Sequence, residues 1–262
     1  MTKIVYYLKS LLTLVAGVRS WGAAVGLLAG RPARPAEIRL RNGSAFRVRT
    51  LMDLWIVKET CLDRDYERDL PPPGSEWKVM DIGAGLGDFA ICAAWKHPRR
   101  KIAVFEPFAE SYRLLEENLR LNGIHNVRAF PLAVGARSGA MLLQTGTGVA
   151  VRHSTAAAGG PASPAALSVE GITLEEALRK AEFDHCDLLK VDCEGGEYDI
   201  FLPAAPETLR RIDRIVMEYH DGCTPHAHGE LAEFLRKQGF TVRLRANPVH
   251  RHLGFLTALR IP

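Results

Sequence analysis

The chain has 262 residues, of which 47% are hydrophobic and 24% charged, so it can bury a full core as one domain with appendages. Lysine plus arginine exceed aspartate plus glutamate by only 34 to 30, and the net charge of +4 is spread along the sequence. We therefore expect a soluble globular protein. Nucleic acid is not an expected partner, because the basic residues form no stripe.

The cysteines are the next general feature, and they are Cys61, Cys92, Cys186, Cys193 and Cys223. Their number is odd, they contain no C-x-x-C pair, and three of them sit in apolar segments. This usage is typical of reduced thiols and predicts a cytoplasmic protein.

Residues 1–30 follow helical spacing, with apolar residues at Ile4, Leu8, Leu11, Val15, Val18 and Val25. Lys9 and Arg19 interrupt every window of the roughly 20 apolar residues that a bilayer crossing needs. Lys9 also breaks the apolar region that a signal peptide would need. We expect a helix that caps the main domain or a partner subunit. The alternative is an amphipathic helix in peripheral contact with a membrane, because lysines and arginines add positive charge here.

A small accessory region follows this helix. It contains IRLRNGSAFRVRT, whose polar and apolar residues alternate around Asn42 and Gly43, and this pattern predicts a hairpin with a two-residue turn. It then contains the helical stretch LMDLWIVKETCL, and Pro71 to Gly74 form a stiff boundary. Residues 1–74 are therefore predicted to form an N-terminal helix, hairpin and linker, and residues 75–262 the main domain.

A glycine motif opens the main domain at Val79 to Asp88, VMDIGAGLGD. The apolar residues predict a buried parallel strand, and the closely spaced glycines allow a tight turn and the approach of a ligand to bare backbone. Asp81 precedes the glycines, and Glu106 ends the next apolar strand, where a carboxylate can bind both hydroxyls of a ribose. The pattern predicts a site for a nucleoside cofactor.

The spacing of the motif distinguishes between cofactors. A dinucleotide fingerprint needs G-x-G-x-x-G, but here the spacing is G-x-G-x-G and Asp88 takes the place of the last glycine. Asp81 and Asp88 would repel a pyrophosphate, whereas they suit the ammonium and sulfonium of S-adenosylmethionine (SAM). We therefore expect SAM, and an NAD-dependent enzyme is the less favoured alternative.

Beyond the motif, strands and helices alternate as a doubly wound sheet requires. The fold class is α/β, with a mostly parallel seven-stranded, Rossmann-like sheet. The expected strands are Val79 to Ile82, Ile102 to Phe105, Val127 to Pro131, Leu188 to Val191, Ile212 to Glu218, Phe240 to Leu244 and Gly254 to Ile261. The expected helices are Asp88 to Lys96, Phe108 to Asn122, a helix after Thr173 with Glu176 completing a capping box, and Glu230 to Gln238.

The segment between the third strand and the capping box is predicted to contain two irregular features. Ala140 to Leu143 form a hairpin extension. Gly146 to Ala166, rich in glycine, alanine, serine and proline, form a long loop that suits a lid.

A second group of polar residues lies in LLKVDCEGGEYDIF and in MEYHDG. Asp192 ends a parallel strand, where open sheets of this type bind ligands, and Glu194 and Glu197 follow it. Glu218 and His220 end the next strand and are separated by one residue, so both can point to the same side. These residues predict a reactive centre with carboxylates and a candidate base.

DIGAGLGD, FEP, the long loop, KVDCEGGEYDIF and MEYH, in this order and spacing, resemble the FkbM family of SAM-dependent methyltransferases over about residues 75–220. The resemblance implies a class I methyltransferase that methylates hydroxyl groups on a glycan or a polyketide-type small molecule. The oligomeric state and the identity of the acceptor stay open. A non-catalytic SAM-binding module is the alternative from another class of function.

The class I fold implies roles for the cofactor-binding residues, which are Asp81, Gly83, Ala84, Gly85, Gly87, Glu106, Pro107, Phe108, Ala133 and Asp192. Asp81 and the glycine turn would hold the amino-acid end of SAM, Glu106 the ribose, and Pro131 to Ala133 the adenine.

The predicted catalytic residues are His220, Asp192 and Glu194. Asp192 would face the methyl group, and His220 would remove the proton of the hydroxyl acceptor. No metal is favoured. The alternative is a divalent metal ion held by Asp192, Glu197 and Glu218, as in some sugar methyltransferases of this class.

Overall fold

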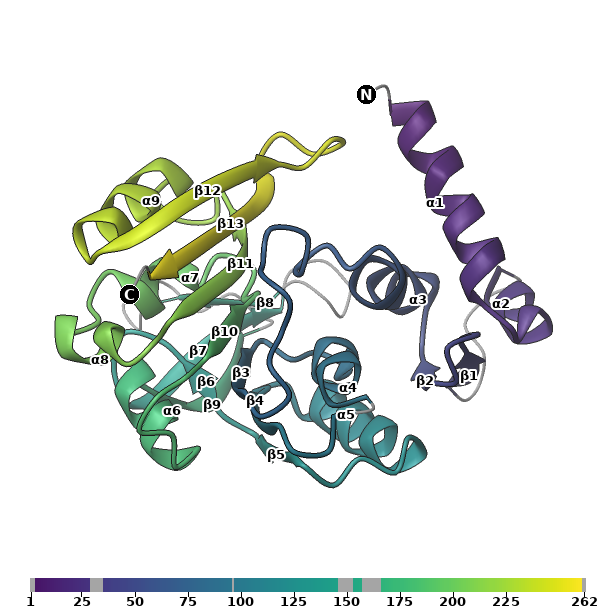
Figure 1. Ribbon diagram of the computed structural model, residues 1–262, viewed down its shortest axis with the longest axis horizontal. Helices are drawn as coiled ribbons and strands as arrows, with labels where there is room; N and C mark the ends of the chain where they lie inside the picture. Colours follow the sequence, from purple (N-terminus) through teal and green to yellow (C-terminus); the bar gives the residue numbers. More distant parts are fainter. Residues whose placement is uncertain (1–2, 29–34, 96, 146–152, 157–165, 261–262) are drawn as a thin grey trace.

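The computed structural model describes residues 3–28, 35–95, 97–145, 153–156 and 166–260. Its centre is a seven-stranded sheet with helices on both faces (Figure 1). In order across the sheet the strands are β12 (Phe240–Ala246), β13 (Leu253–Arg260), β11 (Arg214–His220), β10 (Leu188–Val191), β3 (Lys78–Ile82), β4 (Lys101–Phe105) and β5 (Val127–Phe130). The pairs among β11, β10, β3, β4 and β5 are parallel, and β13 is antiparallel to both of its neighbours. The predicted mostly parallel seven-stranded sheet is confirmed.

The sheet divides the core into two clusters because neighbouring residues of a strand point to opposite faces. Val79 packs in the cluster that contains residues of α4 (Asp88–Ala94) and α5 (Ala109–Leu121). Met80 packs in the other cluster. That face is covered by α6 (Leu174–Lys180), α7 (Glu197–Phe201), α8 (Pro206–Arg210) and α9 (His228–Lys237).

The start of α6 shows how local sequence sets a helix boundary. Thr173 accepts a hydrogen bond from the backbone of Glu176, and the Glu176 side chain accepts one from the backbone of Thr173. This reciprocal pair satisfies two backbone donors that a helix start leaves open. The predicted capping box is confirmed.

A second sheet, of four strands, covers part of the region that we expected to be a loop. Its order is β6 (Ala133–Val134), β9 (Ala166–Ile172), β7 (Gly139–Thr145) and β8 (His153–Ala156). The expected hairpin extension at Ala140 to Leu143 lies in β7. The loop expected from Gly146 to Ala166 is interrupted by β8 and ends where β9 begins, because β7 pairs with both strands. Residues 146–152 and 157–165 of the predicted lid lie outside the described residues.

The N-terminal region contains the expected hairpin, and within residues 3–28 two helices stand in place of the single helix that we expected. Its elements are α1 (Lys3–Gly17), α2 (Trp21–Leu28), β1 (Ala36–Arg39), β2 (Ala45–Val48), α3 (Leu51–Val57) and the π-helix η1 (Lys58–Leu62). β1 and β2 pair in antiparallel register. The turn between them is longer than the predicted two residues, because Leu40 donates its backbone N–H to Ser44 across it.

Asn118 of α5 and Asn122, which directly follows this helix, attach the hairpin to the main domain. Asn122 accepts a hydrogen bond from the backbone N–H of Ala45 over 2.9 Å, and Asn118 accepts one from Arg47 over 2.6 Å. Asn118 is fully buried. The hairpin therefore packs on the domain as a fixed part of it, and the division at residues 74 and 75 stays a prediction.

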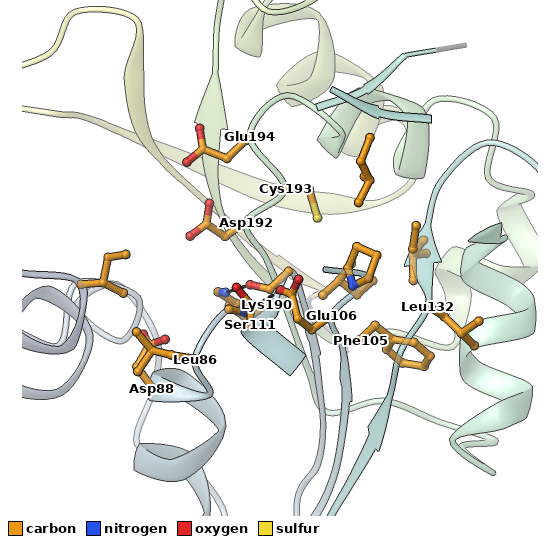
Figure 2. A pocket seen from close by; sticks show the side chains of 18 of the residues that line it. Leu86, Asp88, Phe105, Glu106, Ser111, Leu132, Lys190, Asp192, Cys193 and Glu194 are labelled. Atoms are coloured by element: carbon orange, nitrogen blue, oxygen red, sulfur yellow. Dashed lines mark hydrogen bonds between the residues drawn. The ribbon is translucent and has the colours of Figure 1, made fainter. Parts of the chain in front are cut away.

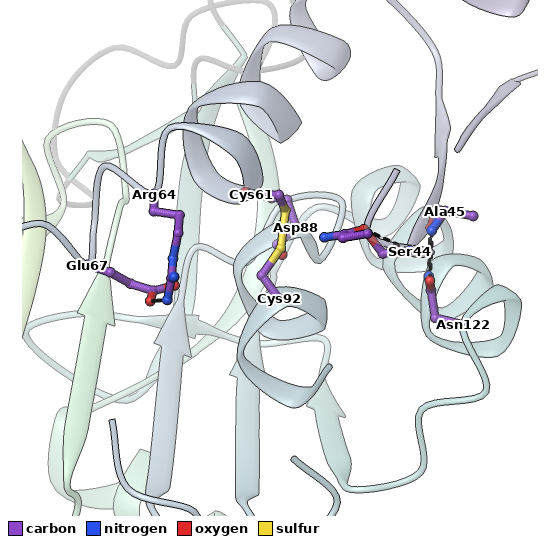
Figure 3. The surroundings of a disulfide bond; sticks show 9 residues. Ser44, Ala45, Cys61, Arg64, Glu67, Asp88, Cys92 and Asn122 are labelled. Carbon is purple, nitrogen blue, oxygen red and sulfur yellow. Dashed lines mark hydrogen bonds and ion pairs between the residues drawn. A yellow bond between two sulfur atoms is a disulfide. The ribbon is translucent and has the colours of Figure 1, made fainter. Parts of the chain in front are cut away.

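A disulfide bond joins the N-terminal region to α4 and corrects the expectation that every cysteine is reduced. Cys61 of η1 and Cys92 of α4 are bonded, with their Cα atoms 6.0 Å apart, and Figure 3 shows the bond beside Asp88. The π-helix continues α3 across α4 and brings together cysteines 31 positions apart, so no local C-x-x-C pattern could indicate the pair. Cys186, Cys193 and Cys223 are free.

Candidate functional site

A cavity opens at the carboxyl ends of β3, β4 and β10, where open α/β sheets bind their ligands (Figure 2). It holds about 910 Å³ of empty space with its open mouth included. Its lining comes from both the main domain and the N-terminal region. The lining residues are Arg49, Asp53, Ile56, Ile82, Gly83, Gly85, Leu86, Asp88, Phe105, Glu106, Pro107, Ser111, Leu132, Ala133, Val134, Leu143, Lys190, Asp192, Cys193 and Glu194.

The glycine turn after β3 brings bare backbone to the cavity. Gly83 has φ +75°, and a Cβ atom there would lie 1.8 Å from the carbonyl oxygen of Asp192, so no other residue fits. Gly85 has φ +54°, and a Cβ built on it would meet nothing within 4 Å. Gly83 thus lets two loops touch, whereas Gly85 faces the open space that a ligand would fill.

Asp81 lies beneath this turn and is fully buried. Its partner is Lys190, the residue beside it in the register of β3 and β10, with Nζ 3.0 Å from Oδ1. Among the described residues, neither Asp81 oxygen accepts a hydrogen bond of full geometry. Burial raises the pKa of Asp81, although Lys190 opposes the shift. Asp81 therefore keeps capacity to accept a bond from a ligand donor.

Glu106 directly follows β4, and backbone N–H groups hold both of its carboxylate oxygens. The N–H of Gly85 donates to Oε2 over 2.8 Å, and the N–H of Phe108 donates to Oε1 over 2.8 Å. Burial raises the pKa of Glu106 to about 7, although these two bonds oppose the shift. Each oxygen keeps a second lone pair, so the carboxylate can still accept bonds from a pair of hydroxyls.

Asp192 and Glu194 line the opposite side of the cavity, in the loop after β10 (Figure 2). Tyr66, from the linker of the N-terminal region, donates its hydroxyl to Asp192 Oδ2 over 2.7 Å. Glu194 has φ +51°, a left-handed conformation that costs energy for a residue with a side chain. The N-terminal region therefore contacts this loop through Tyr66.

Glu197 and His220 lie behind these two carboxylates. Glu197 is fully buried and accepts backbone N–H bonds from Cys193 over 2.8 Å and from Gly195 over 3.0 Å. Its Oε1 also lies 3.2 Å from Nδ1 of His220, whose side chain is 5% exposed. Nε2 of His220 lies 3.5 Å from Glu194 and 4.0 Å from Asp192. Glu197 thus fixes both the loop and the ring.

The carboxylates control the charge of His220. Burial alone lowers the pKa of the imidazole, but the bond and charge of Glu197, with the charges of Asp192 and Glu194, outweigh it and raise the pKa to about 10. Glu218, on the same strand, has its pKa raised well above its usual value by burial and by Asp192. The ring is therefore protonated at neutral pH in the absence of a ligand.

Three residues of this group have atoms close enough to share a metal ion. Asp192, Glu218 and His220 each offer one ligand atom, and these atoms lie within 4.8 Å of one another. Glu197 does not join them, because its oxygens bind two backbone N–H groups and His220. Of the three expected metal ligands, Asp192 and Glu218 lie close together, whereas Glu197 binds backbone N–H groups and His220.

Some of the predicted site residues line the cavity, and others do not. Those that line it are Gly83, Gly85, Glu106, Pro107, Ala133, Asp192 and Glu194. The others, Asp81, Ala84, Gly87, Phe108 and His220, are not on its wall. Asp81 lies beneath it, and Gly87 begins α4 with φ +86°.

Sequence reasoning missed Lys190, Arg49 and Asp53. Lys190 donates to the carbonyl of Gly83 over 3.0 Å and, although burial lowers its pKa, the charges of Asp81, Asp192 and Asp88 raise it. A lysine within an otherwise apolar four-residue strand was the available signal. Arg49 binds Asp53 over 3.0 Å, and no local pattern placed this pair at the cavity.

Comparison with known proteins connects this geometry to a family. The sequence model of the family described as Methyltransferase FkbM domain matches residues 81–242 of this chain. The chain is 24% identical to the hexuronic acid methyltransferase AglP of Haloferax volcanii, over 80% of this chain and 84% of that protein. It is 25% identical to the 31-O-demethyl-FK506 methyltransferase FkbM of Streptomyces tacrolimicus, over 81% of this chain and 91% of that protein.

Two further similarities are limited in what they show. The chain is 29% identical to the AMB antimetabolite synthetase AmbE of Pseudomonas aeruginosa over 73% of its own length, but it spans only 11% of that protein. A crystal structure of the methyltransferase FkbM from Methylobacillus flagellatus superposes with a TM-score of 0.51 at 14% identity, over 78% of this chain and 53% of that one. This superposition shows the fold.

The family match covers more than half of the chain, and the glycine turn, Glu106 and the carboxylates after β10 all lie inside the matched residues. The backbone open at Gly85 and the remaining acceptor capacity of Glu106 at the cavity fit a nucleoside cofactor such as SAM. The chain belongs to the FkbM family of SAM-dependent methyltransferases.

Proposed function

We propose that the protein transfers the methyl group of SAM to a hydroxyl group on a glycan or a polyketide-type small molecule. The observation that carries the proposal is the group of Asp192, Glu194 and His220 across the cavity from Glu106. A hydroxyl must lose its proton as the methyl group is transferred, and this side of the cavity provides acceptors for it. Two relatives are named for a hexuronic acid and for a 31-O-demethyl compound, and these names agree with this acceptor class.

We assign the cofactor roles to residues of the glycine turn and of the strand ends. Asp81 and the backbone of residues 83–87 would bind the amino-acid end of SAM, and Glu106 would bind the ribose. The segment from Pro131 to Ala133 would bind the adenine, and Phe108 would flank its ring, with Pro107 beside it. SAM supplies an electrophilic methyl group on a sulfonium, and the contribution of the protein is to hold the acceptor oxygen in line with it.

Three groups would remove the acceptor proton. Asp192 and Glu194 line the cavity and would meet the hydroxyl first. His220 lies behind them with Nδ1 held by Glu197, which leaves Nε2, 3.5 Å from Glu194, as the atom that exchanges a proton. The pKa of about 10 means that this ring must first release its own proton. Once that proton has left to solvent, Glu194 would take the hydroxyl proton and pass it to Nε2, so we assign the two residues to one relay.

A metal-dependent reaction is the second candidate, and the cluster of Asp192, Glu218 and His220 favours it. Carboxylate oxygens and an imidazole suit magnesium or manganese, which would orient the acceptor oxygen and lower its pKa. If EDTA abolishes turnover and manganese restores it, this candidate replaces the relay. Full activity in EDTA would exclude it.

For the location of the protein, we propose the cytoplasm. The free thiols of Cys186, Cys193 and Cys223 agree with it, whereas a bond such as Cys61–Cys92 is typical of oxidising compartments. No helix in the described part of the chain is long and apolar enough to cross a membrane. Cell fractionation with thiols trapped by an alkylating agent tests the location, and recovery of the oxidised protein outside the cytoplasm would contradict it.

The acceptor class is tested with SAM that carries an isotope-labelled methyl group. The protein is incubated with a panel of uronic acids, neutral sugars and polyketide alcohols, and the products are examined by NMR. We expect the label on an ether oxygen. Label on nitrogen, carbon or a carboxylate ester would contradict transfer to a hydroxyl.

A further inference from the structure

One face of α1 is apolar and open to solvent. With about 100° between successive residues of a helix, Ile4, Leu8, Leu11 and Val15 lie in one stripe along α1. Their exposed fractions are 72%, 58%, 55% and 49%. Val5, Tyr7 and Leu12 are also exposed and widen this stripe. We call these seven residues the apolar stripe. A contiguous exposed patch of this kind marks a surface that meets a partner.

The opposite face of α1 packs on the rest of the protein, so the apolar stripe faces the solvent. Tyr6 donates its hydroxyl to Glu59 over 2.6 Å, and Lys58 donates to the buried hydroxyl of Ser10 over 2.7 Å. Lys58 also lies over the rings of Tyr6 and Trp55. In Figure 1, α1 extends beyond the rest of the molecule. The helix is therefore held by its polar face and presents its apolar face.

The charged residues of α1 itself are both basic, namely Lys3 and Lys9. Helical spacing puts Lys3 and Lys9 about 120° to either side of the centre of the stripe. An apolar stripe between lysines is the pattern of a helix that lies in the plane of a membrane interface.

We propose that α1 docks the protein on a membrane surface that contains anionic lipids, with the apolar stripe in the interface and the basic residues at the headgroups. The helix has 15 residues, about 22 Å, so it is too short to cross the roughly 30 Å hydrocarbon layer and suits a position parallel to it. A dimer packed through the stripe would leave Lys3 and Lys9 outside the contact, whereas a membrane interface uses both the stripe and the lysines, so we take the membrane as the occupant.

Flotation with lipid vesicles tests the proposal on the full chain. We expect the protein to float with vesicles of phosphatidylcholine and phosphatidylglycerol, to float far less with phosphatidylcholine alone, and to release as salt increases. Leu8→Glu removes an apolar side chain that the interface would bury, so binding should weaken about tenfold or more. Lys3→Gln with Lys9→Gln should weaken binding about tenfold on anionic vesicles only.

The matched control is Leu244→Glu on β12, an apolar residue that is 42% exposed outside the N-terminal region, and it should bind like the wild type. SAM affinity and circular dichroism report whether each variant folds, and Leu11→Ser replaces Leu8→Glu if that variant does not. Wild-type protein that fails to float with anionic vesicles overturns the proposal. Self-association in sedimentation that Leu8→Glu abolishes, without vesicle binding, would assign the stripe to a second copy. Because these readouts do not use turnover, they are independent of the proposed acceptor.

Discussion

The two sides of the cavity are built differently. The glycine side, with Gly83, Gly85 and Glu106, uses backbone: both oxygens of Glu106 are held by backbone N–H groups. The carboxylate side, with Asp192, Glu194 and His220, depends on charged side chains from different strands and loops. Lys190 lies between them, paired with Asp81 and raised in pKa by Asp192 as well.

The two sides of the cavity therefore use different kinds of groups to meet a ligand. Backbone donors are fixed by the chain path and cost little to position, so the glycine side is preformed for one ligand. Charged side chains alter the pKa values of one another, so the carboxylate side responds to any ligand that changes its charge. We expect mutations on the glycine side to change affinity for SAM and mutations on the carboxylate side to change turnover.

The largest expected effect comes from Lys190, which links the two sides. Lys190→Met leaves Asp81 buried without its cation, and breaking a buried pair in this way should lower the free energy of unfolding by about 3 to 5 kcal/mol. Urea denaturation measures it. Lys237→Met, the same change at an exposed lysine, should stay within about 0.5 kcal/mol of the wild type. Equal stability of the two variants would show that Lys190 is not the link.

His220 tests the carboxylate side alone. If the ring takes part in proton removal, His220→Ala should lower kcat by roughly 10²- to 10⁴-fold and leave the Kd for SAM near normal. Steady-state kinetics and calorimetry separate the two effects. The control is His185→Ala, a partly exposed histidine at the amino ends of the strands, which should keep full turnover. A loss of SAM affinity with unchanged kcat would reverse the division between the sides.

Glu106 tests the glycine side through pH. Burial raises the pKa of its carboxyl to about 7, and the ionised form is the one that accepts bonds from both ribose hydroxyls. Affinity for SAM should therefore rise with pH and level off above 7, being about tenfold weaker at pH 6 than at pH 8. The slope should be smaller for Glu106→Gln, measured by calorimetry at each pH. Equal slopes in both proteins would assign the titration to another group.

The raised pKa of Glu106 also affects the stability of the folded protein. Because the pKa in the folded state lies above that of the unfolded chain, the contribution of Glu106 is fully present below the usual pKa of 4.5 and is lost as pH rises through about 7. The ligand-free protein should thus gain relative stability above pH 7 when Glu106 is replaced by glutamine.

Tyr66→Phe has the smallest expected effect and refines the comparison. It removes the hydroxyl that donates to Asp192 and keeps the ring that packs on Phe89 and Phe255. A single bond of this kind contributes about 1 kcal/mol, so kcat should fall a fewfold, to about a fifth, with SAM affinity unchanged. Tyr112→Phe, at a tyrosine bonded to a backbone carbonyl, is the control. No change in kcat would mean that Asp192 is positioned by its loop alone.

Most of the sheet could be predicted from the sequence because each strand is a short apolar run that ends in a polar signal. The turn at Gly83 to Gly87 was readable for the same reason, since spacing within ten residues sets it. The role of Lys190 could not be predicted from local spacing. Lys190 and Asp81 are more than a hundred positions apart in the sequence. Their pairing depends on the register of β10 against β3, and only the folded sheet sets that register.

His220 illustrates a partial success. The alternation of β11 correctly put Glu218 and His220 on one side, near Asp192. It could not show that Glu197 would turn inward, bind two backbone N–H groups and hold the ring behind the cavity wall. β8 was missed because its partner, β7, was interpreted as an isolated hairpin extension.

The Cys61–Cys92 bond has a consequence for the unfolded chain. It closes a loop of 31 residues that includes β3 and the glycine turn, and a cross-link of that span removes enough chain entropy to stabilise the fold by about 3 to 4 kcal/mol. The same bond anchors the end of η1, the continuation of the helix that carries Asp53 and Ile56 to the cavity. One wall of the cavity is thus covalently tied to the helix that begins at the glycine turn.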